Sequence, residues 1–263
     1  MTLAFLSAIF GRGRKILSFH SGGYPLTNEA RTAKPASLRG RVFRMFDRVI
    51  AVNPLIAEVF ERYGVEKNNL DVIYPFVHRL PDPSAELRAD LREFIDSHNP
   101  LLATVGLLEN EYDLFMQIDA FEDILSEHPN AGLIIIGSGS LEKSLRSAIA
   151  SKHYVTKMLL AGDVEHAQTL HIINRADALW RTTVYDGDAI SVREALFLGT
   201  PVLATDNGMR PDGVDLIAVG DREALVKKTQ SVLSEKRPRT TPMQDDRSNI
   251  EAVLRVYAEV LAS

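Results

Sequence analysis

The chain has 263 residues, of which 45% are hydrophobic and 25% are charged, so it can bury a sizeable core in one large or two small domains. It contains no cysteine, which excludes a disulfide framework and a thiolate metal site. A net charge of −5, without a basic groove interleaved with aromatic residues, argues against nucleic acid as a partner.

The first apolar run is too short to cross a membrane. It covers residues 3–10, whereas a membrane-spanning helix needs roughly 20 apolar residues. Basic residues follow within 11–15, where a secretory signal would have small residues at its cleavage site. We therefore interpret the run as part of a helix and expect a cytoplasmic location.

Strand and helix patterns alternate through the first 77 residues. We predict strands at 15–19, 49–52 and 72–74 and helices at 35–46 and 54–63, with Gly64 ending the second helix. Such alternation is typical of parallel sheets that are covered by helices.

This first part of the chain is strongly basic. Residues 1–48 carry nine Lys and Arg side chains against Glu29 and Asp47, a net charge of +7. Arg41, Arg44 and Arg48 recur at helical spacing. They predict either a solvated helix face beside a core stripe or a face that contacts an anionic partner. In the second case the protein would lie peripherally on the inner face of a membrane.

A proline-rich stretch at 74–83 interrupts the regular pattern, and we predict a hinge or linker over residues 78–98. Residues 99–236 then have the pattern of a complete doubly wound domain, whose ligands should lie beyond the carboxyl ends of its strands. Its predicted strands are 101–105, 132–136, 157–160, 178–180, 202–205 and 216–219, and its predicted helices are 115–126, 141–150, 167–174, 191–198 and 222–233. Residues 237–263 are predicted to form a linker and a last helix at 249–261.

Residues 185–207 contain the most informative motif. Asp186 and Glu194 lie on either side of a predicted turn from a strand to a helix, and the loop between them lacks large apolar residues up to Ala189. The helix that follows would turn its unbonded amide groups toward the loop. Such amide clusters attract anions, phosphate above all.

This motif resembles the acidic-x7-Glu signature of family-4 retaining glycosyltransferases, here written DGDA at 186–189, EA at 194–195 and GTPV at 199–202. Further pieces resemble that family in the same order. They are RVIAVN at 48–53, VGLL at 105–108, IIGSG at 135–139, LAGDV at 160–164 and RAD at 175–177. The resemblance runs from Ile16 to the last helix.

The resemblance implies an α/β fold of GT-B type with two doubly wound Rossmann-like domains. Residues 1–77 would form an incomplete acceptor-side domain, because the glycine-rich strand, loop and helix that open the family have no counterpart here. Either sequence before Met1 is missing or this is a natural minimal variant. Residues 99–236 would bind the donor, and the last helix would return toward the N-terminal domain.

The implied function is transfer of a sugar, with retention, from a nucleotide-sugar to a saccharide or lipid-linked acceptor. The family generally needs no bound metal, and we expect no cofactor. The histidines of this chain have no metal-ligand spacing, and its carboxylates form no clear cluster.

Glu194 and Asp186 each have two interpretations. Ser191 and Glu194 fit a capping box, in which both would serve a helix start; the resemblance instead assigns Glu194 to the ribose hydroxyls. Asp186 is either a turn former or, by resemblance, a catalytic residue that binds the donor-sugar hydroxyls. The backbone beside it would bind the donor diphosphate through Gly187, Asp188, Ala189 and Ile190.

His20 closes a predicted strand before a glycine-rich turn. By resemblance it is the second catalytic residue and faces the donor sugar across the interdomain cleft, although a lone histidine is more often structural. Val164 would offer its backbone to the nucleobase, or place its side chain in the core.

Three glycines are predicted to line the nucleotide pocket: Gly106, Gly137 and Gly139. A tight turn without a ligand explains the last two equally well, and the missing third glycine disfavours a dinucleotide fingerprint. The family has Arg and Lys where this chain has Leu107 and Tyr112, and that pair holds the diphosphate. The arginines nearby that could replace it are Arg181, Arg193 and Arg210.

Two other functions stay open. A degenerate transferase that kept the fold but lost diphosphate binding would be a non-catalytic interaction protein. A nucleotide-sugar epimerase could use the same architecture, whereas a plain oxidoreductase is disfavoured by the glycine pattern.

Overall fold

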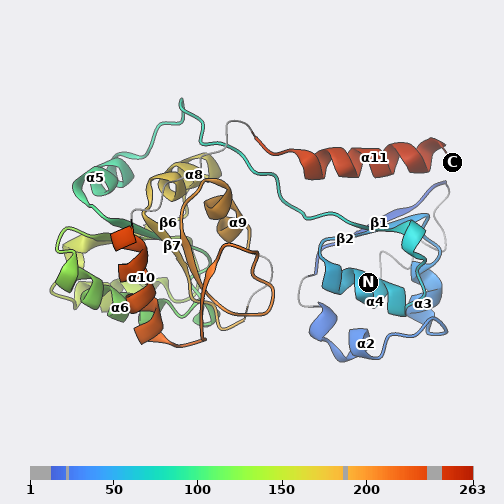
Figure 1. The fold of residues 1–263 in the computed structure, drawn as a ribbon, viewed down its shortest axis with the longest axis horizontal. Coiled ribbons are helices and arrows are strands. Elements are labelled where there is room, and N and C mark those ends of the chain that lie inside the picture. The colour runs from blue at the N-terminus through green and yellow to red at the C-terminus, as the bar shows by residue number, and fades with distance from the viewer. Residues whose placement is uncertain (1–12, 22–23, 186–188, 236–244, 263) are drawn as a thin grey trace. The chain divides into compact units, whose positions relative to one another are not determined.

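The computed structural model describes residues 13–21, 24–185, 189–235 and 245–262. The chain forms two compact units: residues 1–77 together with 246–263 are unit 1, and residues 78–245 are unit 2. Both are built from parallel strands and helices (Figure 1). No helix in these ranges is both long and apolar enough to span a membrane.

Unit 1 contains a parallel sheet in the order β1-β2-β3. Its strands are β1 (Ile16–Phe19), β2 (Arg48–Ala51) and β3 (Leu70–Val72). Its α-helices are α2 (Asn28–Arg31), α3 (Leu38–Phe43), α4 (Pro54–Arg62) and α11 (Ser248–Ala262), and its 3₁₀ turns are Tyr24–Leu26 and Lys67–Asn69.

The two faces of this sheet are covered by different helices, because successive side chains of a strand point in opposite directions. Val49 and Ala51 of β2 belong to a core shared with α3 and α4. Ile50 points the other way and packs with Ile73 and with Val256 of α11. Unit 1 therefore has three layers, with α11 and α4 on opposite sides of the sheet (Figure 1).

Local sequence explains where α4 begins and ends. The side chain of Asn53 accepts a hydrogen bond from the amide of Ile56 at 2.8 Å, and Pro54 occupies the first turn, where no amide hydrogen is needed. Gly64 follows the helix with a φ of 86°, a left-handed conformation that glycine adopts without a steric penalty.

Unit 2 contains a parallel sheet in the order β6-β5-β4-β7-β8-β9. Its strands are β4 (Leu101–Val105), β5 (Gly132–Ile136), β6 (Met158–Gly162), β7 (Ala178–Arg181), β8 (Val202–Thr205) and β9 (Asp215–Ile217). Its α-helices are α5 (Ala89–Ser97), α6 (Leu114–Glu127), α7 (Glu142–Ala150), α8 (His166–Arg175), α9 (Ile190–Phe197) and α10 (Arg222–Glu235), and its 3₁₀ turns are Asn110–Tyr112 and Val155–Lys157.

Helices cover both faces of this sheet, as the doubly wound prediction requires (Figure 1). One hydrophobic cluster joins α6, α7 and α10 to one face and includes Trp180. A second cluster joins α5, α8 and α9 to the other face. The order of the strands reverses between β4 and β7, and ligands of open α/β sheets bind beyond the carboxyl ends at such a point.

The predicted linker 78–98 and the predicted helix 35–46 were wrong. The predicted linker 78–98 contains α5, whose buried Leu91, Phe94 and Ile95 follow helical spacing and pack on the sheet. The predicted helix 35–46 is shorter: it begins after Ser37, whose side chain accepts a hydrogen bond from the amide of Gly40, and ends at Phe43.

The shorter helix also separates the three arginines that were predicted to share one helix face. Arg41 lies in α3, Arg44 is its C-cap residue and Arg48 is the first residue of β2. Their spacing in the sequence is helical, but the chain turns into a strand between the second and the third.

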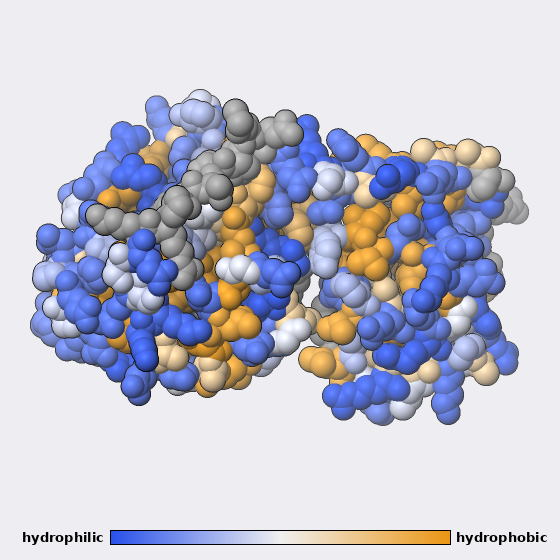
Figure 2. Space-filling model, in the orientation of Figure 1, coloured by the Kyte–Doolittle hydropathy of each residue, from blue (hydrophilic) through white to orange (hydrophobic). Residues whose placement is uncertain are grey.

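The face of the molecule that Figure 2 draws is largely hydrophilic, with hydrophobic side chains between the charged ones. Four of the exposed hydrophobic residues lie on α11, on the side away from Val256: Ile250, Leu254, Tyr257 and Leu261.

Candidate functional site

The carboxyl ends of β4 and β5 meet through glycine. Gly137 has a φ of 134°, and a Cβ atom at this residue would lie 1.8 Å from the carbonyl oxygen of Gly106. A Cβ on Gly139 would lie 2.5 Å from the carbonyl oxygen of Leu108. The amide of Leu108 donates to the carbonyl of Ser138 at 3.0 Å. These glycines therefore let two backbone segments come into contact at the carboxyl ends of β4 and β5.

Arg181, the last residue of β7, lies over the end of β4. It is buried, and its guanidinium donates to the carbonyl of Val105 at 2.7 Å. It also stacks on the ring of Tyr112, 4.6 Å from the centroid. Tyr112 in turn covers Gly106, where a Cβ would lie 2.2 Å from the tyrosine ring. The Tyr112 ring is therefore held between Gly106 and the guanidinium of Arg181.

A buried chain of hydrogen bonds holds the turn that carries Tyr112. The hydroxyl of Thr104 donates to the amide oxygen of Gln117 at 2.7 Å, and the Gln117 amide donates to the hydroxyl of Thr182 at 2.7 Å. The Thr182 hydroxyl donates to the carbonyl of Tyr112 at 2.9 Å. All three linking side chains are almost fully buried, so the network is shielded from water.

Arg210 lies at the same edge of the sheet, beside β8. Its guanidinium donates to the hydroxyl of Thr183 at 2.7 Å and to the carbonyl of Thr205 at 3.1 Å. The two threonines are themselves buried and joined by a hydrogen bond from the Thr205 hydroxyl to the Thr183 carbonyl. Arg210 is therefore held against Thr183, which follows β7, and against the last residue of β8.

Glu194 is a buried carboxylate on α9, with 5% of its surface exposed. Its Oε1 lies 2.6 Å from Nε2 of His166, the first residue of α8. The predicted capping box does not form, because α9 begins after Ala189 and the Ser191 hydroxyl points to the carbonyl of Val105 at 3.5 Å. The buried carboxylate is thus free of a role at the helix start, and its partner comes from a neighbouring helix.

Two other residues of unit 2 lie near the predicted site residues. Val164 follows β6 and packs partly against the hydrophobic cluster beneath α8 and α9. Glu109, which lies between Leu107 and Tyr112 in the sequence, accepts hydrogen bonds from the amide and the hydroxyl of Ser140. These bonds lower the pKa of the Glu109 carboxyl below its usual range, the side-chain bond first. Its charge is therefore directed to the turn before α7.

The remaining predicted site residues fall in different places. Asp186, Gly187 and Asp188 lie outside the described residues. Ala189 is the N-cap residue of α9, and Ile190, Arg193 and Glu194 lie on that helix. His20 belongs to unit 1, where its Nε2 lies 2.9 Å from the hydroxyl of Ser18.

Sequence reasoning missed His166 and the buried residues Gln117, Thr182 and Thr183. A threonine pair directly after a buried strand was a usable signal, because polar side chains at strand ends often line a site. His166 gave no such signal, since its contact with Glu194 depends on how α8 packs on α9. Within the described ranges, no group of three or more His, Asp and Glu side chains could hold a metal ion.

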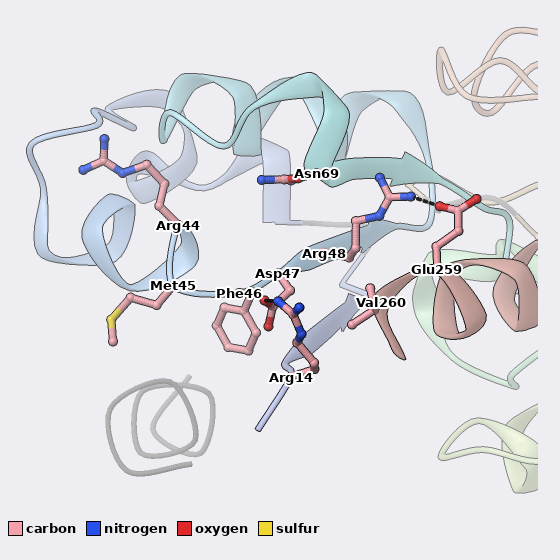
Figure 3. A pocket seen from close by; sticks show the side chains of 9 residues that line it. All are labelled: Arg14, Arg44, Met45, Phe46, Asp47, Arg48, Asn69, Glu259 and Val260. Carbon is pink, nitrogen blue, oxygen red and sulfur yellow. Dashed lines mark hydrogen bonds and ion pairs between the residues drawn. The ribbon is translucent and has the colours of Figure 1, made fainter. Parts of the chain in front are cut away.

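A separate cavity of about 520 Å³ lies in unit 1, beside β2 and α11 (Figure 3). Arg14 pairs with Asp47 at 3.0 Å, and Arg48 pairs with Glu259. The guanidinium of Arg44 donates to two backbone carbonyls. Two of these three arginines are therefore balanced by carboxylates, so the cavity is less positive than the sequence suggests. Its complete lining is Arg14, Arg44, Met45, Phe46, Asp47, Arg48, Asn69, Glu259 and Val260.

Comparison with known proteins gives three findings. Residues 89–248 match the model of the family described as glycosyl transferases group 1. A glycogen synthase of Mycobacterium tuberculosis is 31% identical over 108 residues, which are 41% of this chain and 26% of that protein. An uncharacterized glycosyltransferase of Methanocaldococcus jannaschii is 26% identical over 102 residues, 39% of this chain and 25% of that protein. The matched segment thus spans about a quarter of each of these curated relatives.

Solved structures of low sequence identity share the fold. HepE from Anabaena in complex with UDP has a TM-score of 0.66 at 16% identity, over 90% of this chain and 68% of that one. A TarM variant from S. aureus, in complex with UDP, alpha-GlcNAc-glycerol and fondaparinux, has a TM-score of 0.63 at 14% identity, over 95% and 51%. The predicted α/β fold of GT-B type is confirmed by these neighbours.

Proposed function

The chain belongs to the glycosyl transferases group 1 family, and from this membership we propose that it binds a nucleotide-sugar in unit 2 and transfers the sugar to a saccharide or lipid-linked acceptor. The observation that supports the proposal is the buried Glu194 carboxylate on α9, the helix that follows β7, and β7 is one of the two strands between which the strand order reverses. His166 contacts only one oxygen of this carboxylate, and a carboxylate is a good acceptor for the hydroxyls of a ribose.

The remaining roles follow the family-4 resemblance and are part of the same proposal. The backbone of 187–190, Arg181 and Arg193 bind the diphosphate, and the backbone of Val164 binds the base. Preorganised amides and cations stabilise the charge that develops on the leaving diphosphate. Asp186 and His20 orient the sugar, the leaving phosphate takes the acceptor proton, and the configuration at the anomeric carbon is retained. No metal takes part.

Calorimetric titration of the full chain with UDP, ADP and GDP tests the nucleotide site. We expect at least one to bind, and Glu194→Gln to weaken that binding about tenfold, since a charged hydrogen bond becomes a neutral one. The melting temperature should change little, because the capping box is absent. Glu223→Gln, an exposed carboxylate on α10, is the matched control and should leave affinity unchanged. If none of the three nucleotides binds, the proposal is wrong.

One observation favours the second candidate, a nucleotide-binding protein without transferase activity. Leu107 is 53% exposed where the family has the Arg that holds the diphosphate, and Tyr112 lies under Arg181 where it has the Lys. Losing such cations weakens both binding and stabilisation of the leaving group.

The variant Leu107→Arg separates the two candidates. If the site binds a diphosphate beside Leu107, the added cation should raise the affinity for UDP several-fold and leave the affinity for uridine unchanged. Because Leu107 is exposed, the substitution should change the stability of the protein little. Release of glucose from UDP-glucose by the wild-type chain would favour the enzyme, whereas UDP binding without release, with or without the new arginine, would favour the binding protein.

We further propose that unit 1 contacts an anionic membrane surface, which would place a cytoplasmic protein peripherally at the inner membrane face. Arg41 and Arg44 are exposed, and neither is paired with a carboxylate in the described part of unit 1. The wild-type chain should sediment with anionic vesicles at low salt and be released as the ionic strength rises.

Paired charge reversals test this contact. Arg41→Glu with Arg44→Glu should abolish sedimentation, whereas Arg92→Glu with Lys227→Glu, two exposed cations of unit 2, should have little effect. Equal loss in both pairs would mean that net charge alone drives binding.

A further inference from the structure

His166 is the side chain that meets the buried carboxylate of Glu194. Its Nε2 lies 2.6 Å from Oε1, and the imidazole is 57% exposed while the carboxylate is 6% exposed. An ionised carboxylate can only accept hydrogen bonds, so Nε2 carries the hydrogen that is shared. No other described side chain bonds Glu194, so its second oxygen, Oε2, remains available as an acceptor.

The pair also joins two segments that the proposed function brings to one ligand. His166 opens α8, directly after the loop that carries Val164 and leads out of β6. Glu194 lies on α9, and the buried faces of both helices belong to one hydrophobic cluster. The base and the ribose of a nucleotide are adjacent groups, so a residue between these segments lies between their binding sites.

We propose that His166 is a positioning residue for ribose recognition: it fixes the Glu194 carboxylate so that Oε2 accepts a ribose hydroxyl. The inference rests on the proposed nucleotide site and adds a residue that neither the motif nor the family match assigns. A glutamate side chain has three rotatable bonds, and holding one oxygen in advance reduces the entropy lost when the other binds a ligand. The histidine thus acts through Glu194 and does not need to touch the nucleotide.

The loss of affinity caused by removing His166 should depend on the ribose hydroxyl that Glu194 binds. Removing the imidazole frees the carboxylate, which weakens binding of a ribonucleotide. A 2′-deoxynucleotide lacks one of the hydroxyls that Glu194 can bind, so it has less to lose. His166→Ala should therefore reduce the ratio between the two affinities, whereas a general loss of stability would weaken both equally.

The experiment measures the dissociation constants of UDP and 2′-deoxy-UDP for the full chain by calorimetry, or of the ADP or GDP pair if that nucleotide binds more tightly. We expect His166→Ala to weaken the ribonucleotide about tenfold and the deoxynucleotide less than threefold. His166→Gln, whose amide nitrogen can take the place of Nε2, should restore most of the ratio. His153→Ala, an exposed imidazole before the amino end of β6, is the control.

A double variant shows whether His166 acts through Glu194. Adding His166→Ala to Glu194→Gln should cause almost no further loss, because residues that act on one interaction are not additive. The inference would be overturned, with the proposed function intact, if His166→Ala lowered the affinity for both nucleotides equally, left it unchanged or raised it. Full additivity of the two losses in the double variant would overturn it too. Absence of nucleotide binding by the wild-type chain would overturn both the inference and the proposed function.

Discussion

Among single residues, Gly137 shows most clearly how the absence of a Cβ atom determines the local structure. The methyl group of an alanine would overlap the carbonyl oxygen of Gly106. The backbone segments that follow β4 and β5 would then have to move apart. We expect Gly137→Ala to destabilise unit 2 by about 3 kcal/mol, more than a left-handed φ alone costs. Urea unfolding followed by the fluorescence of Trp180 measures this.

Gly220→Ala is the matched control for that substitution. Gly220 also has a positive φ, 74°, but a Cβ there would meet nothing within 4 Å. Its cost should be roughly 1 kcal/mol, from backbone strain alone. Equal destabilisation by the two variants would mean that the contact between β4 and β5 relaxes easily.

Asp71 in β3 makes the stability of unit 1 depend on pH. Its Oδ2 is buried without a hydrogen bond, and burial raises the pKa of this carboxyl above its usual value, partly offset by Arg48. The folded state therefore holds the proton more tightly than the unfolded state. The resulting stability is complete below pH 3.8 and is lost as the pH rises through the folded pKa.

The variant Asp71→Asn should remove this decline, and hydrogen exchange of peptides from β2 and β3 between pH 3.5 and 7 would measure it. Asp47→Asn is an informative contrast, because a backbone bond from Lys15 and the pairing with Arg14 lower the pKa of Asp47. The stability that Asp47 contributes is present above pH 3.8 and is lost as the pH falls through the folded pKa. Asp47→Asn should therefore remove a pH dependence of stability whose sign is opposite to that of Asp71.

Site residues differed in how far the sequence could predict them. Glu194 was prominent because it belongs to a motif with a fixed spacing, and its candidate role does not require knowledge of packing. His166 and the Thr104–Gln117–Thr182 network are brought together from distant parts of the chain by the order of the sheet. Such contacts cannot be read from local patterns.

The same distinction holds for whole elements. Buried strands β4, β5 and β8 have the predicted bounds, because each is a short apolar run between turn residues. Strand β3 was predicted at 72–74 but pairs with β2 over Leu70–Val72, where the register places Asp71 opposite Ile50. Register depends on the partner strand, which the local sequence does not contain. α5 was missed because the prolines before it suggested a continuous linker.

The packing of α11 on the sheet of unit 1 can be tested with one buried and one exposed residue of that helix. Val256→Ala removes a side chain that packs on Ile50 and Ile73, and should destabilise unit 1 by about 1–2 kcal/mol. Leu254→Ala changes a residue that is 62% exposed and should shift stability by less than about 0.5 kcal/mol. Protection of β2 peptides from hydrogen exchange reports both. An equal effect of the two variants would contradict the packing of α11 on the sheet through the face that carries Val256.

The molecule as a whole has separate hydrophobic cores in its two units, because the described clusters each draw their residues from one unit. We therefore expect unfolding in more than one step. Trp180, the single tryptophan, reports unit 2, whereas far-ultraviolet circular dichroism reports the helices of both. The two urea curves should not coincide. Superimposable curves would show that the units unfold together.

The place of α11 in unit 1 is implied by the family resemblance and cannot be derived from the local sequence pattern. The side-chain amide of Asn249 donates to the carbonyl of Phe76, and α11 completes a core begun by β2 nearly two hundred residues earlier. The sequence pattern predicted a last helix at 249–261. Which surface that helix covers depends on the path of the chain through unit 2.

That path has a consequence for how the protein is made. Unit 1 is discontinuous, since residues 1–77 and 246–263 are separated by all of unit 2. A ribosome releases the first segment early, yet the face of β2 that carries Ile50 stays uncovered until α11 has been translated. Unit 2 emerges in one piece and can fold while synthesis continues. Of the two units, the one whose first residues are translated earlier is therefore completed later, because its core needs the segment that follows unit 2.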